Sequence, residues 1–371
     1  MNKSEKSKDE TLFSWFYEKG FEEDVILSTR VKLVRNLADF KFPKNLSEDD
    51  ERRINSLVED AFSYDENFYF LKRDEISEYG MQTLKENLMI ENNDFSAIEI
   101  NDFQKIFCLV NELNHLKIVK FSSGFDCENA MKNVYKIDES LQEKLQFAAS
   151  YDFGYLTSQI KDCGTGLKIS LRIFIPSIMI SGKIKEFSEI LKSKNFILKP
   201  ILKNPENEFF FQNNDDFSDF FFDLMPEFCQ EGTELDQLAQ IQTLGTYILK
   251  TERKIRSELA DNNPTLVLNL IKSNFAKILN SLFLTYEDAL NAIGIVKFGL
   301  ETNLLTGITE KDLNILLYST KTVRLLLLKN ELLDNNNENL FEKDIKDNKT
   351  LVLQRFRAIV IQEAFKNIKF I

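Results

Sequence analysis

Residues 167–175 alternate apolar and polar side chains with the two-residue period of a β-strand. The odd positions are all leucine or isoleucine, and the polar residues between them are Lys168, Ser170 and Arg172. A strand with this pattern buries one face and presents its polar residues from the other. Every amphipathic strand has a solvated side, so the pattern alone is compatible with a ligand site and with an ordinary wet surface.

Residues 25–33 have the same character. Apolar residues there interrupt a face that can carry Ser28, Arg30 and Lys32 together. Each of these two strands would offer cations from a half-buried sheet.

The chain changes character near Asp261-Asn-Asn-Pro264, which has the composition of a turn. Strand-like and helical stretches mix before this point, and the pattern after it is helical. Thr285-x-x-Asp288 and Thr309-x-x-Asp312 are typical of capping boxes at the start of helices. We therefore predict two domains, over residues 1–260 and 261–371.

Charge and hydropathy exclude several classes of protein. The chain has 47 basic and 59 acidic residues, and a net charge of −12 argues against broad binding to nucleic acid or to an anionic membrane. No apolar run approaches the roughly 18 residues of a membrane span, and residues 1–10 are too charged for a signal peptide. His115 is the only histidine, and the four cysteines are scattered, so no metal site is expected. We expect a cytoplasmic protein.

Three further motifs occur in a fixed order along the chain. They are Ser28-Thr-Arg-Val-Lys32, Asn111-Glu-Leu-Asn-His-Leu-Lys117, and residues 153–168, which read Phe-Gly-Tyr-Leu-Thr-Ser-Gln-Ile-Lys-Asp-Cys-Gly-Thr-Gly-Leu-Lys. Their order and spacing resemble the ATP:guanido phosphotransferases, and most closely the bacterial protein-arginine kinases. The corresponding family patterns are Ser-x-Arg-x-Arg, Asn-Glu-Glu-Asp-His-Leu-Arg and Phe-Gly-Tyr-Leu-Thr-Ser-Cys-Pro-Thr-Asn-x-Gly-Thr-Gly-x-Arg.

The resemblance implies a fold, an activity and partners. The fold would be α+β, an antiparallel β-sheet flanked by helices, followed by an all-α C-terminal domain. The activity would be transfer of the ATP γ-phosphate, with Mg²⁺, to arginine guanidinium groups of proteins. The implied partners are ATP or ADP, phosphoarginine, a second copy of the chain, a zinc-containing activator protein and a protease-associated chaperone.

The predicted nucleotide-binding residues lie in these motifs and on the two strands. They are Ser28, Arg30, Lys32, His115, Lys117, Lys168, Ser170 and Arg172. At positions 32, 117 and 168 the family's phosphate-binding arginine is a lysine here. Lysine keeps the positive charge but lacks the planar fork that binds phosphate oxygens in pairs. We infer an anion pocket that orients a phosphate less strictly than the arginines of the family would.

The predicted catalytic position has lost its carboxylate. The family's catalytic glutamate corresponds to Leu113, which supplies none of the general-base help that is typically worth roughly 10²–10⁴ in rate. Glu112 is the candidate catalytic residue that remains, although neighbours on an extended backbone point to opposite faces. The loop over residues 199–209 is shorter than in the family, and Glu206 and Glu208 are alternatives for the glutamate of that loop.

The C-terminal domain of the protein-arginine kinases carries the phosphoarginine-binding motif Arg-Asp-x-x-Arg-Ala. Here Arg357-Ala358 remains, and Leu353-Gln354 stands in the Arg-Asp places.

Three hypotheses for the function of the chain follow from these motifs. The chain is a weakened or inactive kinase that retains nucleotide or anion binding, an active protein-arginine kinase with a rearranged site, or a non-catalytic dimeric scaffold.

Overall fold

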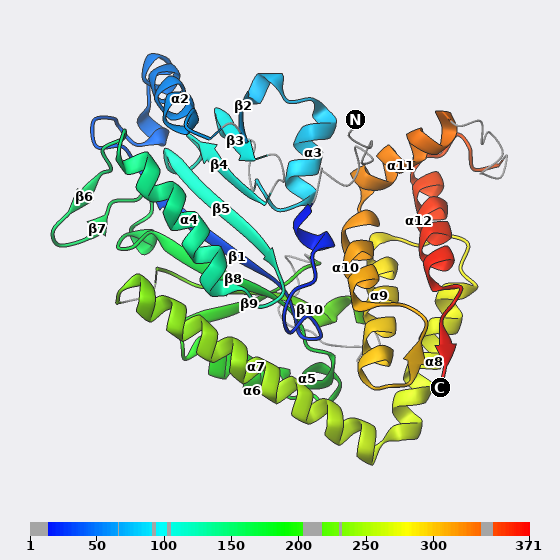
Figure 1. Ribbon diagram of the computed structural model, residues 1–371. Coiled ribbons are helices and arrows are strands. Elements are labelled where there is room, and N and C mark those ends of the chain that lie inside the picture. The colour runs from blue at the N-terminus through cyan, green and yellow to red at the C-terminus, as the bar shows by residue number, and fades with distance from the viewer. Residues whose placement is uncertain are drawn as a thin grey trace, which may run out of the picture. The chain divides into compact units, whose positions relative to one another are not determined.

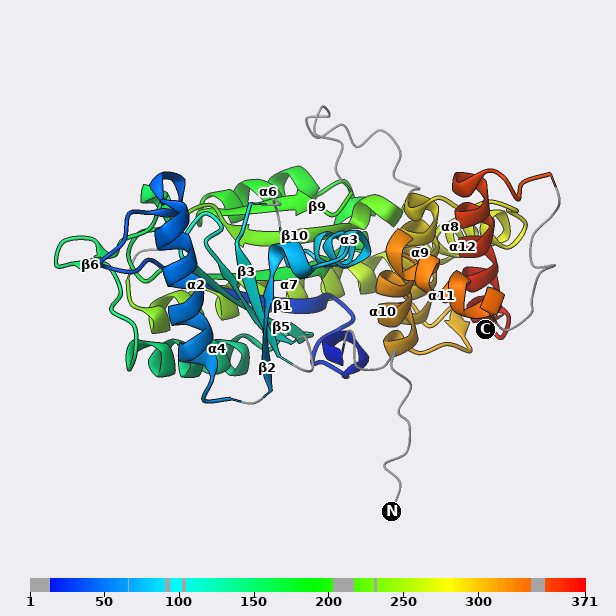
Figure 2. The same cartoon turned by 90° about the horizontal axis from the view of Figure 1, so that it is seen from above.

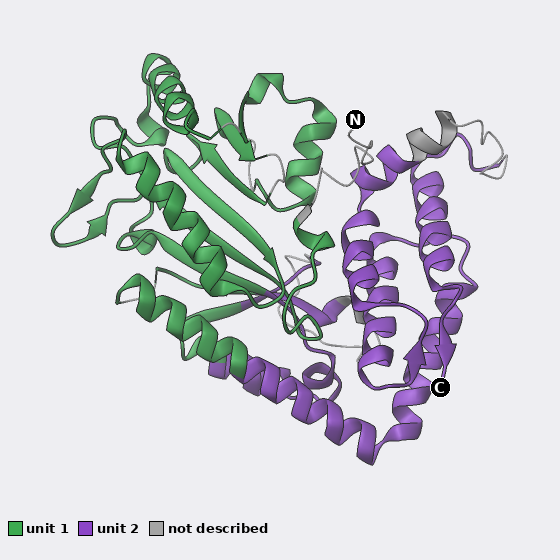
Figure 3. Cartoon of the chain, in the orientation of Figure 1, with its two compact units in different colours: residues 1–171, 191–197, 224–246 green, residues 172–190, 198–223, 247–371 purple. Residues whose placement is uncertain are grey.

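A computed structural model describes residues 14–65, 67–90, 94–101, 105–202, 217–229, 232–334 and 344–371. The chain divides into two compact units, coloured separately in Figure 3. Unit 1 comprises residues 1–171, 191–197 and 224–246, and unit 2 comprises residues 172–190, 198–223 and 247–371. The opening residues 1–10 and the alternatives Glu206 and Glu208 lie outside the described residues.

The central element is an eight-stranded sheet with strand order β2-β3-β4-β5-β1-β8-β10-β9 (Figure 1). Its strands are β1 (Ile26–Arg35), β2 (Phe68–Lys72), β3 (Ala97–Asn101), β4 (Ile106–Val110), β5 (Leu116–Ser123), β8 (Leu167–Phe174), β9 (Phe196–Pro200) and β10 (Phe221–Pro226). Every pairing from β2 through β1 is antiparallel. The predicted antiparallel sheet is confirmed, as are the strands predicted over residues 25–33 and 167–175.

Helices flank this sheet. They are α2 (Glu48–Phe62), α3 (Glu78–Glu86), α4 (Cys127–Gln142), α5 (Pro176–Ile180), α6 (Ile184–Lys192) and α7 (Glu234–Asn262). α2 begins after Ser47, whose hydroxyl accepts a hydrogen bond from the Asp50 amide, and acidic residues fill its first turn, where they complement the helix dipole. α4 packs on β1 and β5, and α2 packs beside α4 (Figures 1 and 2). A small hairpin joins β6 (Ala149–Ser150) to β7 (Gly154–Tyr155).

The chain after α7 is helical, as predicted. Its helices are α8 (Pro264–Leu279), α9 (Tyr286–Glu301), α10 (Glu310–Ser319), α11 (Thr322–Asp334) and α12 (Lys349–Phe365), and β11 (Leu305–Thr306) pairs with β12 (Lys369–Phe370). Both predicted capping boxes are confirmed, at Thr285 of α9 and Thr309 of α10. Within the residues described, no helix combines the length and apolar character needed to cross a bilayer.

The predicted turn at residues 261–264 separates α7 from α8. The two units nevertheless divide the chain elsewhere, because β8, β9, β10 and α7 each contribute residues to both. The assignment of domains to residues 1–260 and 261–371 stays a prediction.

Candidate functional site

The register of β1 against β5 brings predicted site residues onto one face of the sheet. Val34 pairs with Lys117, and Lys32 pairs with Val119. Residues directly opposite each other in an antiparallel pair point to the same side, and alternate residues along a strand share that side. Lys117 therefore lies on the face that carries Arg30 and Lys32.

The neighbouring strand β8 extends this face. The Val34 amide donates to the Gly166 carbonyl at 3.0 Å, and Arg30 Nε donates to Ser170 Oγ at 3.1 Å. These two contacts bracket Lys32 on β1 and Lys168 on β8, so the two lysines are cross-strand neighbours. We call the side formed by Arg30, Lys32, Lys117 and Lys168 the cationic face; the buried Ser28 and Ser170 lie along it.

The opposite side of β1 is covered by α4. Thr29 Oγ1 accepts a hydrogen bond from the amide of Asp126, the residue before α4. Arg35 Nη2 lies 2.9 Å from Asp138 Oδ2 of α4, and both side chains are almost fully buried. Odd-numbered residues of β1 therefore build the core, and even-numbered residues supply the cationic face.

Two lysines of the cationic face are paired with carboxylates of the same chain. Lys117 Nζ donates to both oxygens of Glu112, at 2.9 and 3.0 Å. Lys168 Nζ forms an ion pair with Asp162. The Lys117 and Glu112 side chains are 6% and 7% exposed, and those of Lys168 and Asp162 are 15% and 8% exposed. These pairs are thus largely withdrawn from solvent.

The backbone around Glu112 differs from the expectation of an extended segment. Residues 111–115 form the turn between β4 and β5, and Asn111 has a φ of 52°. The turn folds Glu112 back onto Lys117, while Leu113 is 44% exposed. Glu112 and Leu113 do face different surroundings, but the cause is the turn and not strand alternation.

Asn114 and His115 fasten this turn to its neighbours. Asn114 Oδ1 accepts hydrogen bonds from Asn36 Nδ2 at 2.9 Å and from the Ser158 amide at 2.8 Å. His115 Nδ1 accepts from the Leu37 amide at 3.0 Å, so its other nitrogen, Nε2, carries the proton toward the Lys41 carbonyl at 3.0 Å. The imidazole is fully buried, and both ring nitrogens are engaged with backbone.

We expect the contribution of His115 to the stability of the fold to fall as the pH drops below 6.5. Burial lowers the pKa of His115 from 6.5 to about 4. Between these values the unfolded chain takes up a proton that the folded chain does not, which costs about 2.5 kcal/mol between pH 7 and pH 4.5. Guanidinium unfolding of the wild type and of His115→Gln at both pH values isolates this contribution. The change in stability between the two pH values should differ by about that much between the two proteins, and an equal change in both would contradict the assignment.

The Gly164-Thr-Gly166 motif brings β8 against β1. Gly164 and Gly166 have φ values of 113° and 67°, and a Cβ on Gly166 would lie 2.6 Å from the Val34 carbonyl oxygen. Arg35 Nη1 donates to the Thr165 carbonyl at 2.8 Å. Glycine is therefore required here by backbone conformation and by close approach, and the motif sets the position of Lys168.

Two of the predicted site residues belong to unit 2. Arg172 Nε and Nη2 donate to the carboxylate of Asp223 at 2.9 and 3.1 Å. The guanidinium of the buried Arg357 donates from Nε to the Thr320 carbonyl at 2.9 Å and from Nη1 to the Leu284 carbonyl at 3.0 Å. Both arginines thus join elements within their own unit.

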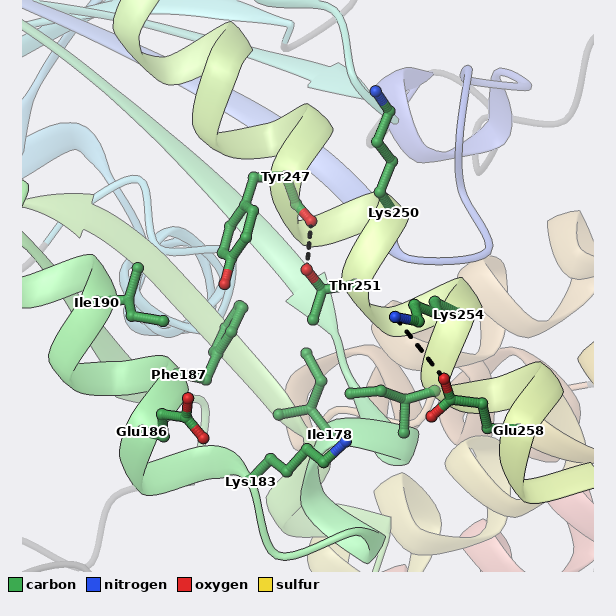
Figure 4. A pocket seen from close by; sticks show the side chains of 11 residues that line it. Ile178, Lys183, Glu186, Phe187, Ile190, Tyr247, Lys250, Thr251, Lys254 and Glu258 are labelled. Carbon is green, nitrogen blue, oxygen red and sulfur yellow. Dashed lines mark hydrogen bonds and ion pairs between the residues drawn. The ribbon is translucent and has the colours of Figure 1, made fainter. Parts of the chain in front are cut away.

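Unit 2 also contains a hollow of about 440 Å³ between α5, α6 and the second half of α7 (Figure 4). The rings of Phe187 and Tyr247 stack there with centroids 6.0 Å apart. Lysines and glutamates both line it, and Lys254 lies 3.9 Å from Glu258. This balance of charges does not select a class of ligand.

Residues 41–208 match the family described as ATP:guanido phosphotransferase, C-terminal catalytic domain. Protein-arginine kinases are similar over most of the chain. That of Listeria welshimeri is 25% identical over 311 residues, covering 82% of this chain and 86% of the relative. The chain is similar to the ATP:guanido phosphotransferase family over residues 41–208 and to protein-arginine kinases over most of its length. The protein-arginine kinase of Clostridium acetobutylicum is 25% identical over 336 residues, covering 88% and 96%.

Solved structures of the family share the fold. The duplicated taurocyamine kinase of Schistosoma mansoni, with bound transition state analog components, gives a TM-score of 0.54 at 18% identity. The match covers 67% of this chain and 37% of that longer chain. Lombricine kinase gives a TM-score of 0.54 at 13% identity and covers 65% and 70%.

The donor set of the cationic face fits the phosphate chain of a nucleotide in sign and in chemistry. Ammonium and guanidinium groups are the usual protein partners of phosphate oxygens. Asp162, the ion-pair partner of Lys168, was not among the predicted site residues. Its signal was present, because the family pattern has asparagine at this position and the chain has a carboxylate.

Proposed function

We propose that this chain is a divergent protein-arginine kinase that binds the phosphates of ATP on its cationic face and transfers phosphate to arginine slowly or not at all. The observation that carries the proposal is the placement of Arg30, Lys32, Lys117 and Lys168 on one side of three adjacent strands. Relatives named protein-arginine kinase support the choice of ATP and arginine as substrates.

Phosphoryl transfer asks the protein mostly for positioning and for neutralisation of charge. ATP, with Mg²⁺, supplies the phosphoryl group, and the cations of the cationic face would hold its phosphates. The weakened part is the site for the arginine guanidinium that accepts the phosphoryl group. Leu113 has no carboxylate to orient a guanidinium or take its proton, and Glu112 is already engaged with Lys117.

Binding and transfer must be measured separately to test this proposal. Calorimetry with ATP and Mg²⁺ should detect binding, and Lys32→Ala should weaken it by roughly tenfold, the value of one charge-assisted contact. Lys132→Ala removes an exposed lysine on α4 and serves as the matched control. Incubation with labelled ATP and an arginine-rich protein should leave no phosphoarginine above background.

Two other outcomes identify the alternatives. Robust labelling that is lost in Lys32→Ala would mean an active protein-arginine kinase with a rearranged site. No change of melting temperature with ATP, ADP or phosphoarginine would favour a non-catalytic scaffold. As part of the proposal we expect a cytoplasmic homodimer whose protein partners are those that the family resemblance implies, an activator protein and a protease-associated chaperone, which size-exclusion chromatography and pull-down experiments can test.

A further inference from the structure

The buried lysines of the cationic face are held by carboxylates that come from turns and not from the sheet. Glu112 lies in the turn between β4 and β5, and Asp162 ends the 3-10 turn η4 (Ile160–Asp162). The strands that carry Lys117 and Lys168 begin only at Leu116 and Leu167. Each carboxylate can therefore withdraw without breaking a hydrogen bond between strands.

The carboxylates take up donor capacity that a phosphate would need. Both oxygens of Glu112 contact the Lys117 ammonium, and Asp162 pairs with Lys168. All four side chains are at most 15% exposed, so these ammonium groups are shielded from water. A phosphate that engages them must replace a carboxylate, and the exchange exposes a charge that was neutralised by a partner.

We propose that Glu112 and Asp162 are internal counter-anions that keep the cationic face closed to single phosphate groups, and that a linear polyphosphate opens it by displacing both. This inference rests on the proposed function. Arg30 provides the first contact, because its guanidinium donates to the Ser170 hydroxyl and is not a partner of either carboxylate in the ion pairs described. A chain of linked phosphates can then reach Lys117 on β5 and Lys168 on β8 from the same molecule, which an isolated phosphate cannot.

Calorimetric titration with sodium tripolyphosphate and with orthophosphate tests the proposal. Glu112→Gln and Asp162→Asn keep the shape of each side chain and remove its charge. Each should lower the Kd for tripolyphosphate by about ten- to hundredfold, as expected when a lysine gains a charge-assisted bond to the ligand, and should make orthophosphate binding measurable. Glu128→Gln is the charge-matched control, since Glu128 pairs with Lys132 on the solvent side of α4 and should leave both Kd values within twofold.

Circular dichroism melting first establishes that each variant folds. If one of the two variants does not fold, the other still tests the proposal. If tripolyphosphate binds the wild-type protein and both folded variants equally, the counter-anion role is wrong while the proposed function stands. If neither phosphate binds any of the proteins, both fail. If orthophosphate binds the wild-type protein as tightly as tripolyphosphate, the face is open and the inference is overturned.

Discussion

Replacing Asp138 with alanine should destabilise the fold by about 4 kcal/mol, because it leaves the Arg35 guanidinium buried without its carboxylate. Asp138 Oδ2 lies 2.9 Å from Arg35 Nη2, and the two side chains are 2% and 0% exposed. The same guanidinium lies 3.6 Å from the centroid of the Tyr155 ring. Urea unfolding at pH 7 measures the loss.

Glu139→Ala is the matched control for this prediction. Glu139 is the next residue of α4 and is exposed, so its loss should change stability by no more than about 0.5 kcal/mol. The double variant Arg35→Met with Asp138→Leu removes both charges and should recover part of the stability. A loss in Asp138→Ala no larger than in Glu139→Ala would show that the pair does not stabilise the fold.

Arg35 also connects this pair to the candidate site. Its Nη1 donates to the carbonyl of Thr165, within the turn that precedes Lys168. Loss of Asp138 should therefore loosen the turn that positions Lys168. The core side of β1 and the cationic face are thus two sides of one strand. A substitution on the core side, such as the loss of Asp138, should therefore also change the position of Lys168 on the cationic face.

The strand pattern predicted which polar side chains of one strand share a side. A two-residue period groups Arg30 with Lys32 on β1 and Lys168 with Ser170 on β8, but it does not show that these two strands are neighbours. The partner strand β5 could not be aligned in the same way, because the register that places Lys117 opposite Val34 depends on the turn at residues 111–115.

The hydrophobic pattern could not predict the counter-ions, because turns have no period. Glu112 reaches Lys117 only because Asn111 adopts a positive φ and redirects the chain. Asp162 reaches Lys168 from a 3-10 turn that no hydrophobic pattern marks. A structural role for His115 was one of two alternatives, but its partners could not be named, since they are backbone groups of Leu37 and Lys41.

The second large effect concerns Glu99, a carboxyl group in the core of β3. The side chain is 2% exposed and sits opposite Cys108 of β4. Burial, together with the negative charge of Glu59, raises the pKa of Glu99 from 4.5 to about 8. Below pH 4.5 both the folded and the unfolded chain hold this proton. Between pH 4.5 and 8 the unfolded chain releases it and the folded chain keeps it, so stability falls as the pH rises.

Glu99→Gln should therefore stabilise the protein by about 5 kcal/mol at pH 8 and by almost nothing at pH 4.5, since each pKa unit corresponds to about 1.4 kcal/mol. Guanidinium unfolding of the wild type and the variant at pH 4.5, 6 and 8 gives the difference at each pH. Glu59→Gln removes only the secondary charge and should give a smaller gain with the same sign. A constant difference between wild type and Glu99→Gln at all three pH values would mean that Glu99 titrates alike in the folded and unfolded chain. The stability that depends on Glu99 falls as the pH rises, whereas the stability that depends on His115 falls as the pH drops. Measuring Glu99→Gln and His115→Gln together therefore separates the contribution of the carboxyl group from that of the imidazole to the stability of unit 1.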